Sequence, residues 1–261
     1  MFNYLSMALN NSAQKAIFKA AKIIKKARYV TAMTGAGISV ESGIRPFRGP
    51  GGLWTERGEP PMNGYEKFLA DPKKYWEEAL SVGIVQKWRV NEVKPNSGHI
   101  AFAEMERIGV LKSLITQNVD DLHNKAGSKN LIEIHGNANM FRCIKCGKRY
   151  KREEIKLNVI PPLCLACGGI IKGDTVMFGE PIPQESLMRC YNEAEKSDCM
   201  IVAGTTAIVY PAAGFPAIVK RKGGYIIEIN PNETILSSIS DITIRGASGI
   251  ALPALLKEIM K

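Results

Sequence analysis

Two pairs of cysteines in the second half of the chain have the spacing of a metal site. Cys143 and Cys146 form one CxxC pair, and Cys164 and Cys167 form a second pair after 17 intervening residues. Each pair can supply two thiolates, and four thiolates complete the tetrahedral shell of Zn²⁺ without leaving a position for water or substrate. We therefore predict a zinc site that is structural rather than catalytic.

A glycine-rich turn provides a second candidate site. Residues 35–39 read Gly-Ala-Gly-Ile-Ser and follow an apolar run that ends at Met33. Such a turn can bring backbone amides up to a diphosphate, although Val40 takes the place of the third glycine in the dinucleotide fingerprint, so the turn alone is also compatible with a purely geometric role. Its continuation adds Phe47 and Arg48, an aromatic ring and a fixed cation beside a loop suited to phosphates.

Polar side chains also follow the apolar run over 111–116. Gln117, Asn118 and Asp120 come at its end, and His135 follows a short apolar segment further on. Ligands of open parallel sheets bind at the carboxyl ends of the strands, but Asn and Asp there can equally cap a following helix. A histidine with a pKa near neutral pH suits proton transfer, and it can equally be structural.

The elements that must position these residues alternate between strands and helices. Short apolar runs predict strands over 29–33, 111–116, 199–203, 225–229 and 242–244, and helical spacing predicts helices over 12–26, 72–79, 99–106, 184–194, 210–220 and 252–260. The alternation indicates an α/β, Rossmann-like parallel sheet with helices on both faces. We place the dinucleotide-binding domain at 12–52, 94–136 and 174–261, a helical insertion at 53–93 and a zinc-binding module at 137–173.

Composition excludes several classes of protein. The 261 residues are 45% hydrophobic and 23% charged, which is typical of globular proteins, and no apolar run is long enough to span a membrane or to form a secretion signal. We therefore expect a cytoplasmic protein without a membrane partner. The net charge of +10 favours an acidic partner, but much of the excess lies at helical spacing that suits a solvated face equally well, in Lys15, Lys19, Lys22, Lys25, Lys26 and Arg28.

In the order in which they occur along the chain, the glycine turn, the polar residues at 117–120, His135 and the two cysteine pairs resemble the sirtuin family, and the resemblance runs from about residue 20 to the C-terminus. The match continues through residues 176–180 (VMFGE), 204–206 (GTT), 209–213 (VYPAA) and 228–230 (EIN). The resemblance implies an NAD-dependent protein lysine deacetylase with NAD as co-substrate and a structural Zn²⁺. Such an enzyme transfers the acetyl group of acetyl-lysine to ADP-ribose and releases nicotinamide, O-acetyl-ADP-ribose and deacetylated lysine.

The resemblance also assigns roles to individual residues. His135 would be the general base, Asn118 would hold a ribose hydroxyl or water, and Phe47 would screen the reactive ribose carbon from water. NAD contacts would come from Gly35, Ala36, Gly37, Ser39, Phe47, Arg48, Trp54, Gln117, Asn118, Asp120, Gly204, Thr205, Thr206, Asn230 and Ser248. The peptide would add as a strand, and its contacts would be Val176, Met177, Phe178, Gly179, Glu180 and Tyr210.

One departure from the family pattern, and one motif that only some members carry, bear on activity. Arg45-Pro46 stands where many members have proline followed by aspartate, which affects how the cofactor loop is ordered. Members that remove succinyl or malonyl groups carry a tyrosine followed three residues later by an arginine; here Tyr75 is followed at that spacing by Glu78, and Lys87-Trp88-Arg89 has no tyrosine before it. Without a buried cation an acidic acyl group would be desolvated unpaired, so an acetyl or another neutral acyl group is expected.

Two other functions fit parts of the sequence. A mono-ADP-ribosyltransferase would also cleave the nicotinamide bond, but it would leave ADP-ribose on a protein side chain. A zinc-bearing nucleic-acid-binding protein without turnover fits the charge and the cysteines, yet the cysteine segment lacks an aromatic ladder for stacking bases. The preferred partner is an acyl-lysine protein or peptide; DNA-associated substrates would suit the basic charge, and direct nucleic-acid binding is not required.

Overall fold

The computed structural model describes residues 9–81 and 93–261, and a six-stranded parallel sheet forms its centre. The strand order is β3-β2-β1-β7-β8-β9. The bounds are β1 Val30–Thr34, β2 Leu111–Thr116, β3 Leu131–Glu133, β7 Cys199–Ala203, β8 Tyr225–Ile229 and β9 Ile242–Ile244. The chain runs outward from β1 to β3 on one side and from β7 to β9 on the other, so the strand order reverses between β1 and β7. Open α/β sheets bind ligands at such a switch point.

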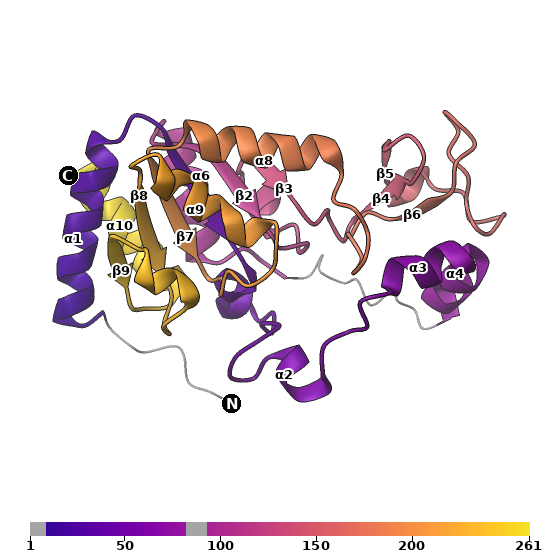
Figure 1. The fold of residues 1–261 in the computed structure, drawn as a ribbon, viewed down its shortest axis with the longest axis horizontal. Helices are drawn as coiled ribbons and strands as arrows, with labels where there is room; N and C mark the ends of the chain where they lie inside the picture. The colour runs from indigo at the N-terminus through magenta and orange to yellow at the C-terminus, as the bar shows by residue number, and fades with distance from the viewer. Residues whose placement is uncertain (1–8, 82–92) are drawn as a thin grey trace.

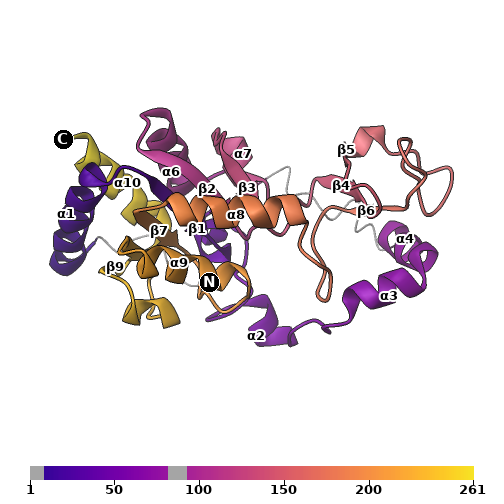
Figure 2. The same cartoon turned by 45° about the horizontal axis from the view of Figure 1, so that its top comes forward.

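Helices cover both faces of this sheet, as the sequence predicts (Figures 1 and 2). One face carries α1 (Asn11–Lys26), α6 (Ser97–Arg107) and α10 (Ser248–Met260), and the other carries α8 (Gln184–Lys196) and α9 (Phe215–Arg221). Side chains alternate between the faces: Val30 and Ala32 join the core beneath α1 and α10, whereas Met33 joins the core beneath α8 and α9. Burial on both faces explains why the strands are nearly continuous apolar runs.

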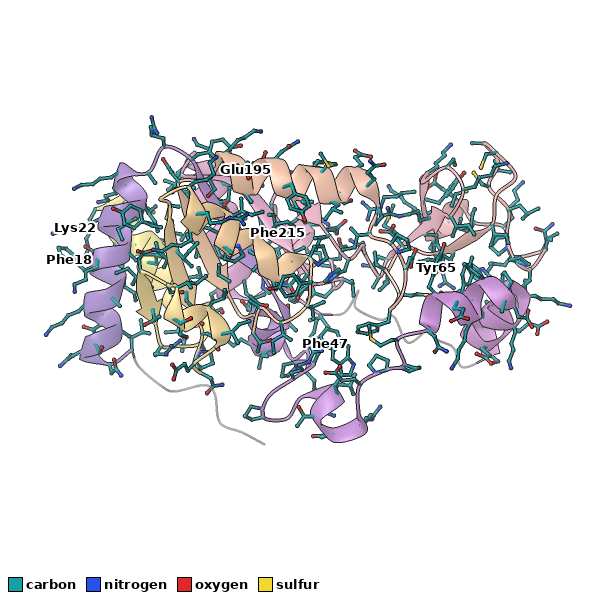
Figure 3. The ribbon with its side chains drawn as sticks, in the orientation of Figure 1. Phe18, Lys22, Phe47, Tyr65, Glu195 and Phe215 are labelled. Atoms are coloured by element: carbon teal, nitrogen blue, oxygen red, sulfur yellow. The ribbon has the colours of Figure 1, made fainter. Side chains whose placement is uncertain are left out.

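Helix α1 packs its apolar side against the sheet and exposes its lysines. Asn10 caps the helix by accepting a hydrogen bond from the Ala13 amide at 2.8 Å, and Ile17 and Ile24 are among the residues buried against the sheet. Lys22 lies over the exposed ring of Phe18 at 4.2 Å, on the outer side of the helix (Figure 3). No helix within the described residues is long and apolar enough to cross a membrane.

A smaller lobe combines two separate segments of the chain. Its antiparallel sheet has the order β5-β4-β6, with β4 Met140–Cys143, β5 Arg149–Lys151 and β6 Ile171–Gly173. Helices α3 (Gly64–Ala70) and α4 (Pro72–Ser81) lie beside it, whereas α2 (Leu53–Arg57) lies apart (Figure 1). Trp76 of α4 joins the segments, because its Nε1 donates to the carbonyl of Ile171 at 2.8 Å and its ring stacks on Phe141 at 5.7 Å. The end predicted for the helical insertion, at 82–93, lies almost wholly outside the described residues.

Two helix boundaries differ from the prediction by more than two residues. The prediction of a helix over 210–220 is wrong for its first half. A cis Tyr210–Pro211 bond and a single 3₁₀ turn at Ala212–Gly214 come first, and α9 begins at Phe215. Helix α10 begins at Ser248 rather than at residue 252, and the Gly249 amide in its first turn donates to the Glu41 carboxylate at 2.7 Å. This capping group lies far away in the sequence, so local patterns do not reveal it.

Candidate active site

A cleft opens at the switch point of the large sheet and extends to the small lobe. It has a volume of about 1350 Å³, which exceeds the roughly 300–1,000 Å³ of a site for one small molecule. All the residues predicted to contact cofactor or peptide line this cleft, with the exceptions of Ser39 and Asp120. The cleft therefore has room for a dinucleotide together with part of a peptide.

The glycines of the 35–37 turn allow two loops to pack closely. The Gly37 amide donates to the carbonyl of Gly204 at 2.8 Å, which joins the loop after β1 to the loop after β7. A Cβ on Gly37 would lie 2.7 Å from the Gly204 Cα, and one on Gly35 would lie 2.7 Å from the Thr205 Cβ. The structure is compatible with both roles considered for this turn. Its glycines are required for packing, as a geometric role demands, and its backbone lines the cleft, as diphosphate binding demands.

Asn118 connects the cleft to a buried polar group behind it. Its amide nitrogen donates to the Gly35 carbonyl and to the Ser39 hydroxyl, both at 3.1 Å. The Ser39 hydroxyl donates in turn to Asp120 at 2.6 Å, and burial raises the pKa of that carboxyl. Both amide hydrogens of Asn118 are thus used, which leaves its Oδ1 atom to accept a hydrogen bond from a ligand. Ser39 and Asp120 lie where they orient Asn118.

His135 has the protonation state that a base requires. Its Nδ1 lies 3.1 Å from the carbonyl oxygen of Gln117. A carbonyl oxygen can only accept, so Nδ1 carries the hydrogen and Nε2 keeps its lone pair. Burial lowers the pKa of His135, while the bond to Gln117 opposes this shift. The ring is therefore neutral at pH 7 and lines the cleft together with Asn118.

The other two histidines are buried and adjacent to one another. The rings of His99 and His123 lie 4.8 Å apart, and His123 Nε2 lies 3.0 Å from the Thr34 hydroxyl. Burial lowers the pKa of His99 to about 4, and burial followed by the proximity of His99 holds the pKa of His123 well below its usual range. Both rings are neutral in the folded protein above pH 6, and neither was among the predicted site residues.

Because these two histidines are buried in the neutral form, we expect the free energy of unfolding to fall in acid. Below pH 6.5 an unfolded chain binds protons on both rings, whereas the folded protein resists protonation, so stability is complete above pH 6.5 and falls as the pH drops. For His99 alone the shift to about 4 corresponds to about 3 kcal/mol between pH 7 and pH 4. Urea unfolding at both pH values measures this loss. A His99→Gln variant should lose clearly less stability than the wild type on acidification, and an equal loss would contradict the assignment.

An aromatic and cationic cluster borders the cleft on the side of α2. Phe47 lies between the sheet and this helix (Figure 3), with its ring 4.5 Å from that of Trp54. Trp54 also lies 5.6 Å from Phe178 and 4.6 Å from the guanidinium of Arg48. Arg48 pairs with Glu59 at 2.8 Å. The loop predicted to contact NAD is therefore held against the segment predicted to contact the peptide.

Arg45, the departure from the family pattern, folds this loop back on itself. Its guanidinium donates twice to the carbonyl of Gly51, at 2.9 and 3.1 Å, and pairs with Glu56 at 2.6 Å. Both charged side chains are about half exposed. The pair orders the loop through contacts that solvent screens in part.

A buried lysine braces the segment predicted to contact the peptide. The side chain of Lys172 is only 1% exposed, and its Nζ lies 3.0 Å from the carboxylate of Glu180 and 2.9 Å from the carbonyl of Thr175. Glu180 in turn accepts a hydrogen bond from the Met177 amide at 2.8 Å. The sequence did not predict this role, since Lys172 stands in a module rich in basic residues. Tyr210, on the rim, is 76% exposed.

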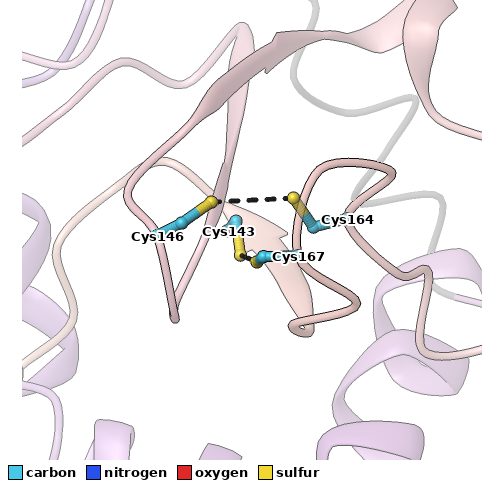
Figure 4. A group of neighbouring side chains, drawn as sticks. All are labelled: Cys143, Cys146, Cys164 and Cys167. Carbon is cyan, nitrogen blue, oxygen red and sulfur yellow. Dashed lines mark hydrogen bonds between the residues drawn. The ribbon is translucent and has the colours of Figure 1, made fainter.

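The four cysteines converge in the small lobe (Figure 4). The Sγ atoms of Cys143 and Cys167 lie 3.5 Å apart and those of Cys146 and Cys164 lie 3.7 Å apart. A tetrahedron with zinc–sulfur bonds of about 2.3 Å has edges of about 3.8 Å, so the arrangement fits Zn²⁺. A disulfide, with sulfurs about 2.05 Å apart, does not fit these distances. The Tyr150 hydroxyl lies 2.9 Å from the Cys164 sulfur, and this bond lowers the pKa of Cys164 to about 6, which favours the thiolate that binds metal.

Proteins of similar sequence are named for a shared activity. The NAD-dependent protein deacylase 1 of Archaeoglobus fulgidus is 45% identical over 248 residues, which cover 93% of this chain and 98% of that protein. The NAD-dependent protein deacylase of Pyrococcus abyssi is 42% identical over 253 residues, which cover 94% and 98%.

Solved structures extend the similarity to the fold. A complex of a Sir2 homologue with NAD has a TM-score of 0.76 and 45% identity, covering 93% of both chains. A Sir2–p53 peptide–NAD⁺ complex has a TM-score of 0.74 and 32% identity, covering 91% of this chain and 95% of that one. The sequence profile of the Sir2 family matches residues 35–211. The chain therefore belongs to the Sir2 family.

Proposed function

We propose that this protein is an NAD-dependent protein lysine deacetylase in which His135 is the general base. The observation that carries the proposal is the neutral His135 ring, whose Nδ1 donates to Gln117 and whose other nitrogen is free to accept a proton at the cleft. Relatives named NAD-dependent protein deacylases, and Sir2 structures with NAD and with a peptide, support both the cofactor and the type of substrate.

The residues of the cleft would divide the work between binding and proton transfer. Bound NAD would supply the ribose to which the acyl group is transferred, with nicotinamide as the leaving group. Asn118 would accept a hydrogen bond from a ribose hydroxyl through Oδ1, and His135 would remove a proton from a ribose hydroxyl. Phe47, whose ring contacts that of Trp54 and which borders the cleft, would exclude water from the reacting carbon.

The charges that line the cleft support a neutral acyl group. Among its described lining residues the only arginines or lysines are Arg45 and Arg48, and each already pairs with a glutamate. The ring of His135 is neutral at pH 7. A carboxylate on the acyl chain would thus be desolvated without a free cation. Residues 87–89, which also bear on acyl preference, lie outside the described part of the chain.

This preference can be measured with matched peptides. Because a tenfold change corresponds to about 1.4 kcal/mol, and desolvating an unpaired carboxylate costs more than this, we expect kcat/KM for an acetyl-lysine peptide to exceed that for a succinyl-lysine peptide at least about tenfold. Mass spectrometry follows loss of each acyl group with NAD present and absent. Faster removal of succinyl would overturn the acetyl assignment, and a stable mass gain of ADP-ribose on the peptide would indicate ADP-ribosyl transfer instead.

A further inference from the structure

A buried acidic residue in β8 has no evident role in forming the sheet. Glu228 is 1% exposed, although the other buried positions of this strand are isoleucines. Its carboxylate accepts hydrogen bonds from the hydroxyls of Thr234 and Ser237, the latter at 2.7 Å, and from Arg245 at 3.0 Å. Burying a carboxylate costs free energy unless it is hydrogen-bonded and paired with a charge. These three hydrogen bonds offset that cost, which indicates that the buried carboxylate has a specific structural role.

The partners of Glu228 belong to one wall of the cleft. Residues 230–234 line the cleft, and Thr234 is both part of this wall and a donor to Glu228. Arg245 reaches the same wall, because its guanidinium donates to the carbonyl of Asn232 at 3.0 Å and to the Ser237 hydroxyl at 2.8 Å. Glu228 and Arg245 therefore hold the backbone of this loop from behind, without lining the cleft themselves.

The position of this wall identifies the part of the ligand that it meets. His135 follows β3, whereas residues 230–234 follow β8. The two strands are four places apart in the sheet order, which corresponds to about 19 Å at the usual strand spacing. A dinucleotide whose reactive ribose lies at His135 would thus place its adenosine end near the loop that follows β8.

We propose that Glu228, together with Arg245, is a positioning residue that shapes the wall at 230–234 and thereby sets the affinity for the adenosine end of the dinucleotide. This inference rests on the proposed function. It predicts an effect on cofactor binding that is separate from the chemistry, because Glu228 touches neither His135 nor Asn118. It also predicts that the peptide site is unaffected, since residues 176–180 lie against the small lobe.

The test compares Glu228→Gln with the wild type. Glutamine keeps the size of the side chain but removes the charge that Arg245 and the two hydroxyls face, so we expect KM for NAD to rise about tenfold. The values of kcat at saturating NAD and KM for the acetyl-lysine peptide should change less than about twofold. Isothermal titration with ADP-ribose should show the same tenfold weakening with an unchanged stoichiometry, which separates weaker binding from a loss of folded protein.

Two further variants keep the test decisive. Arg245→Lys changes a partner whose side chain is 34% exposed and should raise KM for NAD by about threefold, even if Glu228→Gln does not fold. Glu258→Gln removes a partly buried carboxylate that pairs with Lys261 at the end of α10, away from the cleft, and should behave as wild type. Unchanged ADP-ribose affinity in a folded Glu228→Gln or in Arg245→Lys, or an equal fall in kcat, would overturn the inference. A wild type that neither binds ADP-ribose nor turns over NAD would instead overturn the proposed function.

Discussion

Replacing His135 with alanine is expected to lower NAD-dependent deacetylation by about 10²- to 10⁴-fold, the usual contribution of a general base. The affinity for ADP-ribose should stay within about threefold, because Gly35, Gly37 and the wall at 230–234 do not depend on this ring. Peptide mass and nicotinamide release measure the first quantity, and isothermal titration measures the second.

The pH dependence of the wild type gives an independent check on this base. Burial lowers the pKa of His135, so the neutral ring persists to below its ordinary value of 6.5, and kcat should fall only below that pH. A His135→Ala variant that binds ADP-ribose normally but retains deacetylation within threefold of the wild type would show that another group takes the proton.

Removing the metal site is expected to have the second large effect. Cys164→Ala should reduce bound zinc from one equivalent per chain to nearly none, since metal binding supplies much of the folding free energy of small zinc modules. The module should lose its ordered fold, which near-ultraviolet circular dichroism can follow through Tyr150 and its neighbours. Zinc content is measured by atomic absorption after dialysis against a chelator.

The matched control is the other class of cysteine in this chain. Cys190 is buried in α8, and burial raises the pKa of its thiol to about 12, so it is a poor metal ligand. Cys190→Ala should retain one zinc per chain. Equal zinc content in Cys164→Ala and the wild type would refute the four-cysteine site.

Loss of zinc should also disturb the candidate active site, because ion pairs of the buried Asp174 connect the zinc module to it. Asp174 is fully buried and pairs with Arg142 at 2.5 Å and with Arg149 at 2.6 Å, and both arginines come from the small antiparallel sheet. Two residues after Asp174, the Val176 amide donates to the carbonyl of His135 at 2.9 Å. Disorder in the module would therefore disturb His135, so turnover should fall in Cys164→Ala although no zinc ligand lines the cleft.

The large sheet could be predicted from sequence because its strands carry their signal locally. Strands buried on both faces are continuous apolar runs, and four of the six strands have the bounds that these runs predict. The metal site could also be predicted from the sequence, since the spacing of the four cysteines alone defines two metal knuckles. Family motifs located His135 and Asn118, and the structure places both on one cleft.

The remaining features depend on contacts between distant segments. Ser39 and Asp120 belong to the same motifs as the cleft residues, but only packing places them behind Asn118 rather than on the surface. Lys172 and Glu228 look like ordinary charged residues in the sequence, and their burial becomes visible only when their partners assemble. The early start of α10 likewise follows from a Glu41 carboxylate more than two hundred residues away.

NAD-dependent deacetylation is measured by incubating the wild-type protein with an acetyl-lysine peptide in the presence and absence of NAD, and by following peptide mass and free nicotinamide together. We expect the peptide to lose its acetyl group only when NAD is present, with one nicotinamide released for each acetyl group removed. An unchanged peptide, or a peptide that gains the mass of ADP-ribose, would show that the protein is not an NAD-dependent deacetylase.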